Sequence, residues 1–535
     1  MPIDHRLDDA AMGAFLRDGL HLLQPPELDA GFHAQCFAAA DGLYATAKRE
    51  GGNTAHLRLL GDNLLAQVPA LNRLLAAPSL RGALASLLGE GHVLHPHQFV
   101  HAAGRIDQGF HQDGNLPWNT RGHFRSPRPI AAILFYYPQA VTDEMGPTEV
   151  LPGTQYWRGS FEDGAQWHGD DHLDRAFDAD AGRDPDLDRR DARIAASLDV
   201  LGAGSVTRRR LCVPAGTVAL LHYDLVHRGT RQATGQDARR YMYKFYFLRT
   251  QEPRRATWNN VSPQVPGRPA GTPLDVANTP VVERNWQWLR GHANPATPGV
   301  HDVPMLAQQL RDPHERTRRA AGYALADAGS AQGDAREAVL DALCAAITDA
   351  EVTARRMAAF ALGETRCVDG RVLDALVHAL ADADTFVRSN AAFALGSLAR
   401  VRTLPAPAID ALLARLDVQV EPDNTQSAGL SRSTVRECVL QALLMAACND
   451  GLDDAQLGQL AARGLADPGR YVRGLTVQAL LNNAGGNLPA WLEPLLRHLE
   501  GAQYHALPAA DAGTPMADGA AARAASPTTM QGLRS

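Results

Sequence analysis

The first 90 residues show apolar positions at the spacing of an α-helix. The stretches AMGAFLRDGLHLL, LLAQVPALNRLLA and LRGALASLLG repeat Leu, Ala and Met every three or four residues, which gives each segment one apolar face. We therefore predict that residues 1 to about 90 are mainly helical. Their apolar faces are expected to cover the layer that follows in the chain.

From about residue 93 the pattern changes to short runs of β-branched and aromatic residues. These runs are VLHPHQFVH, IAAILFYYP, TEVLPG, GTVALLHYD and RYMYKFYFL, and Gly, Pro and Asn turns separate them. Such runs are typical of strands, so a β-sandwich or barrel is predicted. A segment rich in Asp and Arg between about 158 and 205 lacks this alternation and is interpreted as an insertion between strands.

Proline density marks the end of this first region at about residue 250. A stretch with so many prolines disfavours regular structure, and they stand at Pro253, Pro263, Pro266, Pro269, Pro273 and Pro280. Residues 1–250 are therefore predicted to form one domain. Residues 251–300 are predicted to form a wrapping, Pro-rich linker with a short helix.

Beyond residue 301 the chain repeats itself. LRDPHERTRRAAGYALADAG, ITDAEVTARRMAAFALGET, LADADTFVRSNAAFALGSL and LADPGRYVRGLTVQALLNN align with an Asp six residues before an Arg in each unit. These marker arginines, each followed by a Leu seven residues later, are Arg318, Arg355, Arg388 and Arg473, with a degenerate copy at Arg436. Self-similarity of this kind predicts a solenoid of helices.

The repeated units resemble HEAT repeats over residues 301–500, which implies an all-α domain. The constant spacing from Asp to Arg favours an internal contact between turn and helix over a phosphate- or peptide-binding surface. Residues 501–535 are of low complexity and are predicted to form a disordered tail.

Length and composition narrow the classes of function. A chain of 535 residues is longer than a domain with a single hydrophobic core usually is, which agrees with the division above. The net charge of −7 offers no basic field for nucleic acid or anionic membrane, so small molecules or proteins are the expected partners. Six cysteines without a CxxC spacing suit a reducing cytoplasm. No run of about 18 apolar residues occurs, so neither export nor a membrane span is expected.

A candidate metal site lies in the stretch GFHQDGN. His111 and Asp113 are two residues apart, so on a strand both side chains point to one face. His227, in LLHYDLVHRGT, supplies a second imidazole. Two histidines and one carboxylate leave three positions of an octahedral ion open, which suits iron(II) oxygenases. His222, five residues before His227, remains a rival ligand.

The order of these motifs resembles the phytanoyl-CoA dioxygenase family from MGAFLRDGLHLL to about residue 248. MGPTEVLPGTQYW lies between the two parts of the ligand set, and an Arg-containing strand follows His227. The resemblance implies a double-stranded β-helix, a jelly-roll of the cupin-like kind, with iron(II), 2-oxoglutarate as co-substrate and O₂. It also implies hydroxylation or another oxidation, because related halogenases have a small residue in place of Asp113.

The family carries an Arg on a late strand that holds the distal carboxylate of 2-oxoglutarate, and Arg239 and Arg240 compete for this role. Arg239 shares a strand face with Tyr241 and Tyr243, whereas Arg240 shares one with Lys244. We therefore predict that Arg239 points inward. The family usually places this Arg eleven residues after the distal His, and Arg239 stands at twelve, so its assignment requires one extra residue in the turn.

Three further residues are candidate contacts of the co-substrate or the pocket. Gln98 lies on the strand before His111, whereas Trp118 and Thr230 follow metal ligands. An ordinary strand amide, a packed aromatic and a turn hydroxyl are the alternatives. The run from Arg208 to Arg210 could hold an anionic substrate, but a solvated loop is the favoured interpretation.

The sequence thus predicts an iron(II)- and 2-oxoglutarate-dependent dioxygenase with His111, Asp113 and His227 as its catalytic metal ligands. Arg239, Gln98 and Thr230 are the predicted contacts of the co-substrate. It would hydroxylate a small metabolite or a carrier- or peptide-bound substrate, while the repeats bind the carrier or a partner protein. A catalytically silent scaffold or sensor that acts through the repeats is one alternative. A cupin-like metalloenzyme that needs no oxo acid is another.

Overall fold

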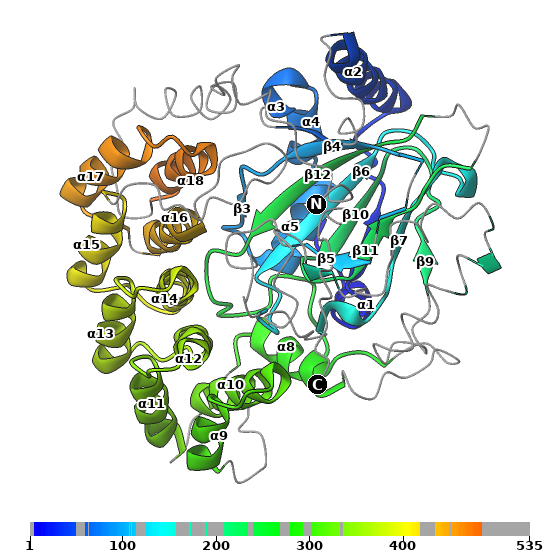
Figure 1. Ribbon diagram of the computed structural model, residues 1–535. Helices are drawn as coiled ribbons and strands as arrows, with labels where there is room; N and C mark the ends of the chain where they lie inside the picture. The colour runs from blue at the N-terminus through cyan, green and yellow to red at the C-terminus, as the bar shows by residue number, and fades with distance from the viewer. Residues whose placement is uncertain are drawn as a thin grey trace, which may run out of the picture.

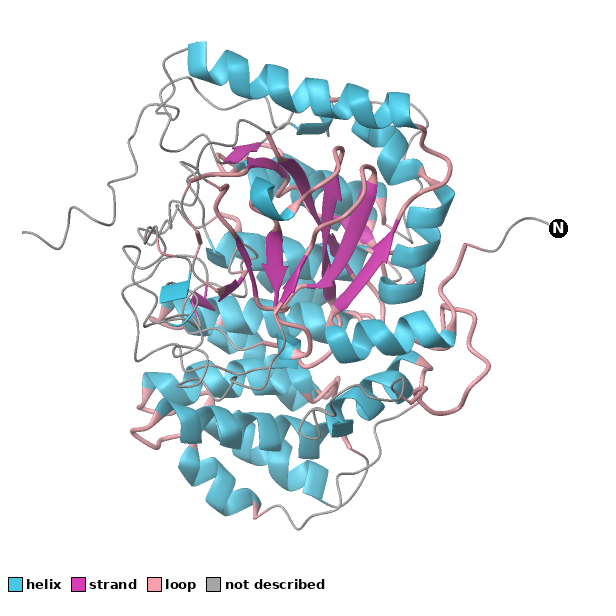
Figure 2. Cartoon of the chain, turned by 90° about the vertical axis from the view of Figure 1, so that its right-hand side faces the viewer, coloured by secondary structure: helices cyan, strands magenta, loops and turns pink. Residues whose placement is uncertain are grey.

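The computed structural model shows a β-rich half and a helical half that lie side by side (Figure 1). The strands lie in the middle of Figure 2, with helices above and below them. The structure describes residues 5–49, 59–61, 64–105, 107–108, 110–113, 125–156, 171–172, 208–233, 239–267, 279–292, 302–331, 335–417, 434–449 and 451–483, with a few single residues between 186 and 192.

The larger sheet of the described chain has seven antiparallel strands in the order β1-β10-β6-β12-β4-β2, with β3 paired to β12. Their bounds are β1 Leu20–Leu23, β2 Leu59–Gly61, β3 Val93–Leu94, β4 Phe99–Ala102, β6 Ala131–Tyr137, β10 Thr217–His222 and β12 Tyr241–Leu248. Every residue of β6 and β12 is buried. Burial on both faces explains why these strands read as nearly continuous apolar runs.

The smaller sheet lies against the larger one and has the order β8-β5-β11-β7-β9. Its strands are β5 His111–Gln112, β7 Thr148–Val150, β8 Asp171–His172, β9 Arg209–Arg210 and β11 His227–Gly229. All their pairings are antiparallel. The predicted double-stranded β-helix of two packed sheets is confirmed.

The N-terminal helices cover one face of the larger sheet. They are α1 Asp9–Asp18, α2 Ala30–Arg49, α3 Leu64–Gln67, α4 Leu71–Ala76 and α5 Pro78–Leu88. Phe32 and Leu84 of these helices share an apolar cluster with Tyr243 and Phe245 of β12. The predicted cover helices are thus present between the sheet and solvent.

The prediction was wrong for the end of AMGAFLRDGLHLL, which is a strand rather than a helix. Helix α1 ends because Gly19 adopts a left-handed conformation with φ 72°, and Leu20–Leu23 then pairs with β10. A glycine in this conformation is a common helix terminator. The short apolar run after it fits an edge strand as well as a helix turn, so spacing alone did not separate them.

The segment after residue 250 packs over α1. It includes helix α8 Thr279–Leu289. The rings of Trp258 and Trp286 lie 5.0 Å apart, and the Trp258 indole donates a 2.7 Å hydrogen bond to Asp9. The described part of this segment therefore wraps the first domain, whereas the predicted boundaries at residues 250, 300 and 500 remain predictions.

Ten helices follow in the described chain and form two rows (Figure 1). The inner row, toward the sheets, is α10 Glu315–Ser330, α12 Val352–Glu364, α14 Thr385–Ala399, α16 Thr434–Ala447 and α18 Arg470–Leu481; the outer row is α9 Val303–Gln309, α11 Ala335–Ala346, α13 Gly370–Ala379, α15 Ala406–Arg415 and α17 Asp454–Gly464. Successive inner helices approach closely: a Cβ on Gly363 would lie 2.7 Å from the Cα of Ala394. The predicted all-α solenoid is confirmed.

The predicted turn-to-helix contact of the marker arginines is also confirmed. Arg355 Nη1 donates to the carbonyl of Asp349 at 2.9 Å, and Arg388 Nη1 donates to that of Asp382 at 2.6 Å. The same bond recurs at Arg318 and Arg473. Each Arg ties the start of an inner helix to the turn before it, which explains the spacing of six.

The inner row packs against the β-rich half through polar contacts. Arg128 Nη1 bonds Glu364 Oε2 of α12 at 2.6 Å, and Arg366 Nη1 lies 3.1 Å from Glu252 Oε1. Asn449 Nδ2 donates to the carbonyl of Thr250 at 2.8 Å. The concave side of the solenoid is therefore covered by the chain's own first half.

No described helix combines the length and apolarity needed to cross a bilayer.

Candidate metal centre

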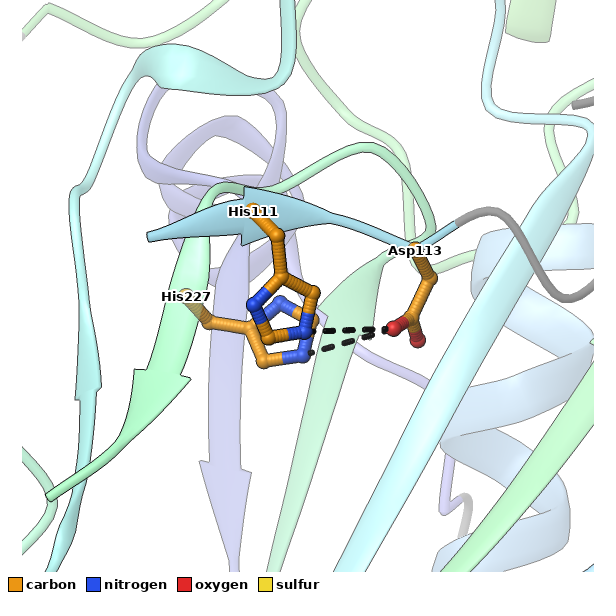
Figure 3. Close-up of side chains that lie close together, drawn as sticks. All are labelled: His111, Asp113 and His227. Atoms are coloured by element: carbon orange, nitrogen blue, oxygen red, sulfur yellow. Dashed lines mark ion pairs between the residues drawn. The ribbon is translucent and has the colours of Figure 1, made fainter. Parts of the chain in front are cut away.

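His111, Asp113 and His227 come together between the two sheets. His111 lies opposite His227 in the pairing of β5 with β11, and Asp113 follows β5 directly. The Nε2 atoms of His111 and His227 lie 3.6 Å and 3.7 Å from Asp113 Oδ1, and Figure 3 shows the three side chains converging. In the described chain they are the one group of His, Cys, Asp and Glu side chains that could hold an ion.

A single metal ion fits this arrangement. Asp113 is fully buried, yet its Oδ1 has no hydrogen-bond partner among the described residues. A buried carboxylate oxygen without a partner is costly unless a cation binds it. Neighbouring ligand atoms of an octahedral ion lie about 3 Å apart when its bonds are about 2.1 Å. A small contraction of the two distances from Nε2 to Oδ1 would therefore let all three side chains bind one ion.

The His227 ring is oriented for ligation. Its Nδ1 lies 2.9 Å from the carbonyl of Leu225, which can only accept, so Nδ1 carries the proton. The lone pair is then on Nε2, which faces Asp113. Burial lowers the pKa of His227 to about 4, so the ring is neutral at pH 7, as metal binding requires.

Asp113 is held by two side chains of β12. Lys244 Nζ lies 2.7 Å from its Oδ2, and the Tyr246 hydroxyl donates to the same oxygen at 2.9 Å. Burial acts to raise the pKa of Asp113, but opposing charges, led by Lys244, hold the pKa well below its ordinary value. The carboxylate is therefore ionised, with Oδ2 occupied and Oδ1 left for a metal.

The predicted inward orientation of Arg239 was wrong. Its side chain is 62% exposed and forms an ion pair with Asp41. Arg240 is 4% exposed instead, on the face of β12 that carries Lys244 and Tyr246. The aromatic face that suggested otherwise is buried under the cover helices rather than at the metal centre.

The described residues among the other predicted contacts form no hydrogen bond with the candidate ligands. The Thr230 hydroxyl donates to the carbonyl of Pro147 at 2.6 Å, as a turn hydroxyl does. Gln98 is buried just before β4, and its Oε1 has no hydrogen-bond partner among the described residues. No hydrogen bond joins Gln98 to His111, Asp113 or His227 in the described chain, and Trp118 lies outside it.

The rival ligand and the arginine run have other surroundings. His222 is buried beside Phe15, and its Nδ1 accepts a bond from the Asp224 backbone. Arg210 pairs with Asp143 at 2.8 Å at the edge strand β9. Neither residue belongs to the group that could hold an ion.

The sequence pattern missed four residues that surround Asp113. Besides Lys244 and Tyr246, Arg125 donates from both Nη1 and Nη2 to the backbone carbonyl of Asp113 at 3.2 Å. His97 packs on Tyr246 with ring centroids 5.0 Å apart. Period-two alternation along β12 could have identified the first two, once Arg240 was assigned to the inner face.

Comparison with known proteins supports both halves of this description. A family model described as HEAT repeats matches residues 303–396 and 340–431. L-proline trans-4-hydroxylase of Streptomyces griseoviridis is 30% identical over 199 residues, which are 35% of this chain and 66% of that protein. The chain thus spans slightly less than two thirds of that relative.

Solved structures give weaker matches. The epimerase SnoN, in complex with Fe3+, alpha ketoglutarate and nogalamycin RO, is 18% identical with a TM-score of 0.32; the match covers 45% of this chain and 83% of that one. EctD from S. alaskensis with bound Fe is 17% identical with a TM-score of 0.29, over 45% of this chain and 75% of that one. These values are too low to support an argument about function.

The hydroxylase relative, the buried ligand set and the repeat match agree with one another. The ligand set is the one expected for iron(II) with an oxo-acid co-substrate. The chain thus joins a β-rich half, which carries the buried His-Asp-His set and resembles part of the L-proline trans-4-hydroxylase, to helices that match HEAT repeats.

Proposed function

We propose that the protein is an iron(II)- and 2-oxoglutarate-dependent dioxygenase, with His111, Asp113 and His227 as its metal ligands. The observation that carries the proposal is the buried Asp113 Oδ1, which faces two imidazole nitrogens and has no other partner in the described chain. When bound, iron(II) with 2-oxoglutarate supplies the activation of O₂ for oxidation of a C–H group.

Arg240 is the proposed anchor of the distal carboxylate of 2-oxoglutarate. It is buried on the same strand face as Lys244 and Tyr246, both of which contact Asp113. Its charge also helps to lower the pKa of the half-buried His101, after desolvation and Lys244. A guanidinium in this position can donate two parallel hydrogen bonds to a carboxylate.

Lys244 and Tyr246 would orient Asp113 for binding through a single oxygen. Because both donate to Oδ2, only Oδ1 remains for the ion. One-oxygen binding by Asp113, with two imidazoles, leaves three positions of an octahedral ion for co-substrate and O₂. Retention of the carboxylate favours hydroxylation over halogenation.

The proposed substrate is a small metabolite, or one bound to a carrier or peptide. A small molecule is favoured because the relative from Streptomyces griseoviridis is named for the hydroxylation of L-proline. A protein partner or substrate carrier would bind the outer row of the repeats, because the inner row packs against the oxygenase half. A reducing cytoplasm remains the proposed location, since six separate thiols suit it.

The test is an anaerobic titration of iron(II) into the metal-free protein, with and without 2-oxoglutarate. Wild type should develop the weak visible charge-transfer band that an oxo acid produces when it chelates iron(II). Asp113→Ala should not develop the band, although it should remain folded. Iron binding without the band would favour a cupin-like enzyme that needs no oxo acid, and no iron binding would favour the silent scaffold.

A further inference from the structure

Two tyrosines of the HEAT repeats connect to Asp113 through one or two intervening residues. Tyr323 lies on α10, near the start of the repeats, and Tyr471 lies on α18, near their end. Both belong to the inner row (Figure 1). The two connections reach Asp113 at different atoms, one at its backbone and one at its side chain.

The first connection passes through Arg125. The Tyr323 hydroxyl accepts a 2.9 Å bond from the Arg125 backbone N–H and donates a 3.0 Å bond to the Arg125 carbonyl. The Arg125 guanidinium in turn holds the carbonyl of Asp113 and forms a 2.5 Å ion pair with Asp224. The Tyr323 hydroxyl thus fixes the backbone of Arg125, and the Arg125 side chain in turn holds the backbone of Asp113.

The second connection passes through His97 and Tyr246. The Tyr471 hydroxyl lies 2.5 Å from His97 Nδ1. The His97 ring packs on Tyr246, whose hydroxyl donates to Asp113 Oδ2. Tyr471 is 2% exposed and shares a small apolar cluster with Phe99 of β4, so its ring packs against the sheet rather than against solvent.

Buried charges fix the repeats in this position. Arg128 and Glu364 are both almost fully buried, and their ion pair joins the β-rich half to α12. Ser126 donates to the same carboxylate at 3.2 Å. Breaking such a buried pair is costly, so sliding of the inner row along the sheet is disfavoured. Tyr323 and Tyr471 are therefore held in one register.

We propose that the HEAT repeats are part of the metal centre, with Tyr323 and Tyr471 acting as positioning residues that hold Asp113 in its ligating orientation. The proposal rests on the function proposed above. A contact that only satisfies buried hydroxyl groups would stabilise the fold without changing metal affinity. Groups that orient a metal ligand affect the affinity itself, and this difference separates the two roles.

The test compares three single-hydroxyl deletions in the full-length chain: Tyr323→Phe, Tyr471→Phe and Tyr243→Phe. Tyr243 is the matched control, because its buried hydroxyl donates to the Cys36 carbonyl from the opposite face of β12. Iron(II) affinity would be measured anaerobically by competition with a chelator. Thermal unfolding of the metal-free proteins would be measured in parallel.

We expect Tyr323→Phe and Tyr471→Phe each to weaken iron(II) binding by about 3- to 10-fold, somewhat less than the usual effect of residues that contact a ligand directly. Tyr243→Phe should bind iron(II) with an affinity within about twofold of wild type. This should hold even if its unfolding temperature falls as much as those of the two repeat variants. A tyrosine variant that binds iron like wild type has no positioning role. Equal weakening in all three variants would overturn the proposal as well.

Failure of this inference can be distinguished from failure of the proposed function. If wild type binds no iron(II), the oxygenase proposal itself fails. If wild type binds iron(II), and Tyr323→Phe and Tyr471→Phe bind it as tightly as wild type does, only the positioning role of the repeats fails.

Discussion

The HEAT repeats and the metal centre are assembled in opposite ways. In the repeats, Arg355 bonds the carbonyl of Asp349, six residues earlier, and the same bond recurs in other units. At the metal centre, His111 pairs with His227, and Tyr471 contacts His97 across 374 positions of the chain. Local contacts leave a regular pattern in the sequence, whereas a site built from distant segments leaves only scattered residues.

The two rows of the repeat domain differ in burial. All but the first two residues and one other of α14 are buried, whereas α13 of the outer row buries only four side chains. A solenoid of two equally exposed faces would not show this difference. The inner row therefore packs as an interior layer against the β-rich half, and loss of that contact should cost more stability than loss of a contact within the repeats.

The largest effect on stability is expected at the buried ion pair between the two halves. Glu364→Gln leaves the Arg128 charge buried without its partner, which should lower the free energy of unfolding by about 3–5 kcal/mol. Chemical denaturation of the full chain measures this change. The control is Glu337→Gln, which removes an exposed partner of Arg371 and should leave unfolding unchanged. If Glu364→Gln and Glu337→Gln changed the free energy of unfolding equally, the ion pair between the two halves would not contribute to the stability of the chain.

Acid should destabilise the metal-free β-rich half through the buried His227 and the half-buried His101. Burial lowers the pKa of His227 to about 4, and burial with nearby positive charges holds the pKa of His101 well below 6.5. Stability is fully present above pH 6.5 and is lost as the pH falls toward 4, because the unfolded chain takes up protons first. His227 alone should account for about 3 kcal/mol.

Denaturation curves recorded between pH 7.5 and 4 test this dependence. The unfolding free energy of His227→Gln should fall less steeply with acidity than that of wild type. Parallel curves for the two proteins would mean that His227 is not buried as a neutral ring.

The two neighbouring arginines before β12 should differ in their effect on co-substrate binding. Arg240→Met should weaken binding of 2-oxoglutarate by about 100-fold, because two charge-assisted hydrogen bonds are lost. Arg239→Met removes an exposed side chain paired with Asp41 and should change that affinity by less than about twofold. Calorimetric titration of the metal-loaded variants distinguishes them. A larger effect of Arg239→Met would restore it as the anchor.

The smallest effect is expected inside one repeat. Arg355→Met removes hydrogen bonds to the carbonyls of Asp349 and Ala350 and an ion pair with Asp382. It should lower the free energy of unfolding by about 1–2 kcal/mol while iron(II) affinity stays at the wild-type value. Loss of iron binding in Arg355→Met would contradict the view that this contact is local.

The sequence predicted the features that depend on local regularity. The runs around β6, β10 and β12, and the role of Arg355 and its counterparts, follow from spacing alone. The three candidate metal ligands were recognisable because the motifs around them follow the order seen in the family that the chain resembles; His111 and Asp113 alone are a weak signal.

The sequence did not predict features that depend on how layers pack. Both faces of β12 are buried, so hydrophobicity could not decide whether Arg239 or Arg240 faces the metal centre. Gly19 separates α1 from β1 by its backbone conformation, which apolar spacing does not reveal. Tyr323 and Tyr471 gain their positions only when the solenoid packs on the sheets.

Binding of 2-oxoglutarate to the full-length protein, with and without a redox-stable metal such as Mn(II), tests the central claim most directly. We predict binding that requires the metal, because the oxo-acid end needs the ion held by His111, Asp113 and His227 while Arg240 holds the distal carboxylate. Binding should be lost in Asp113→Ala. Absence of binding to the metal-loaded wild type, or equal binding without metal, would contradict the assignment of an oxygenase site.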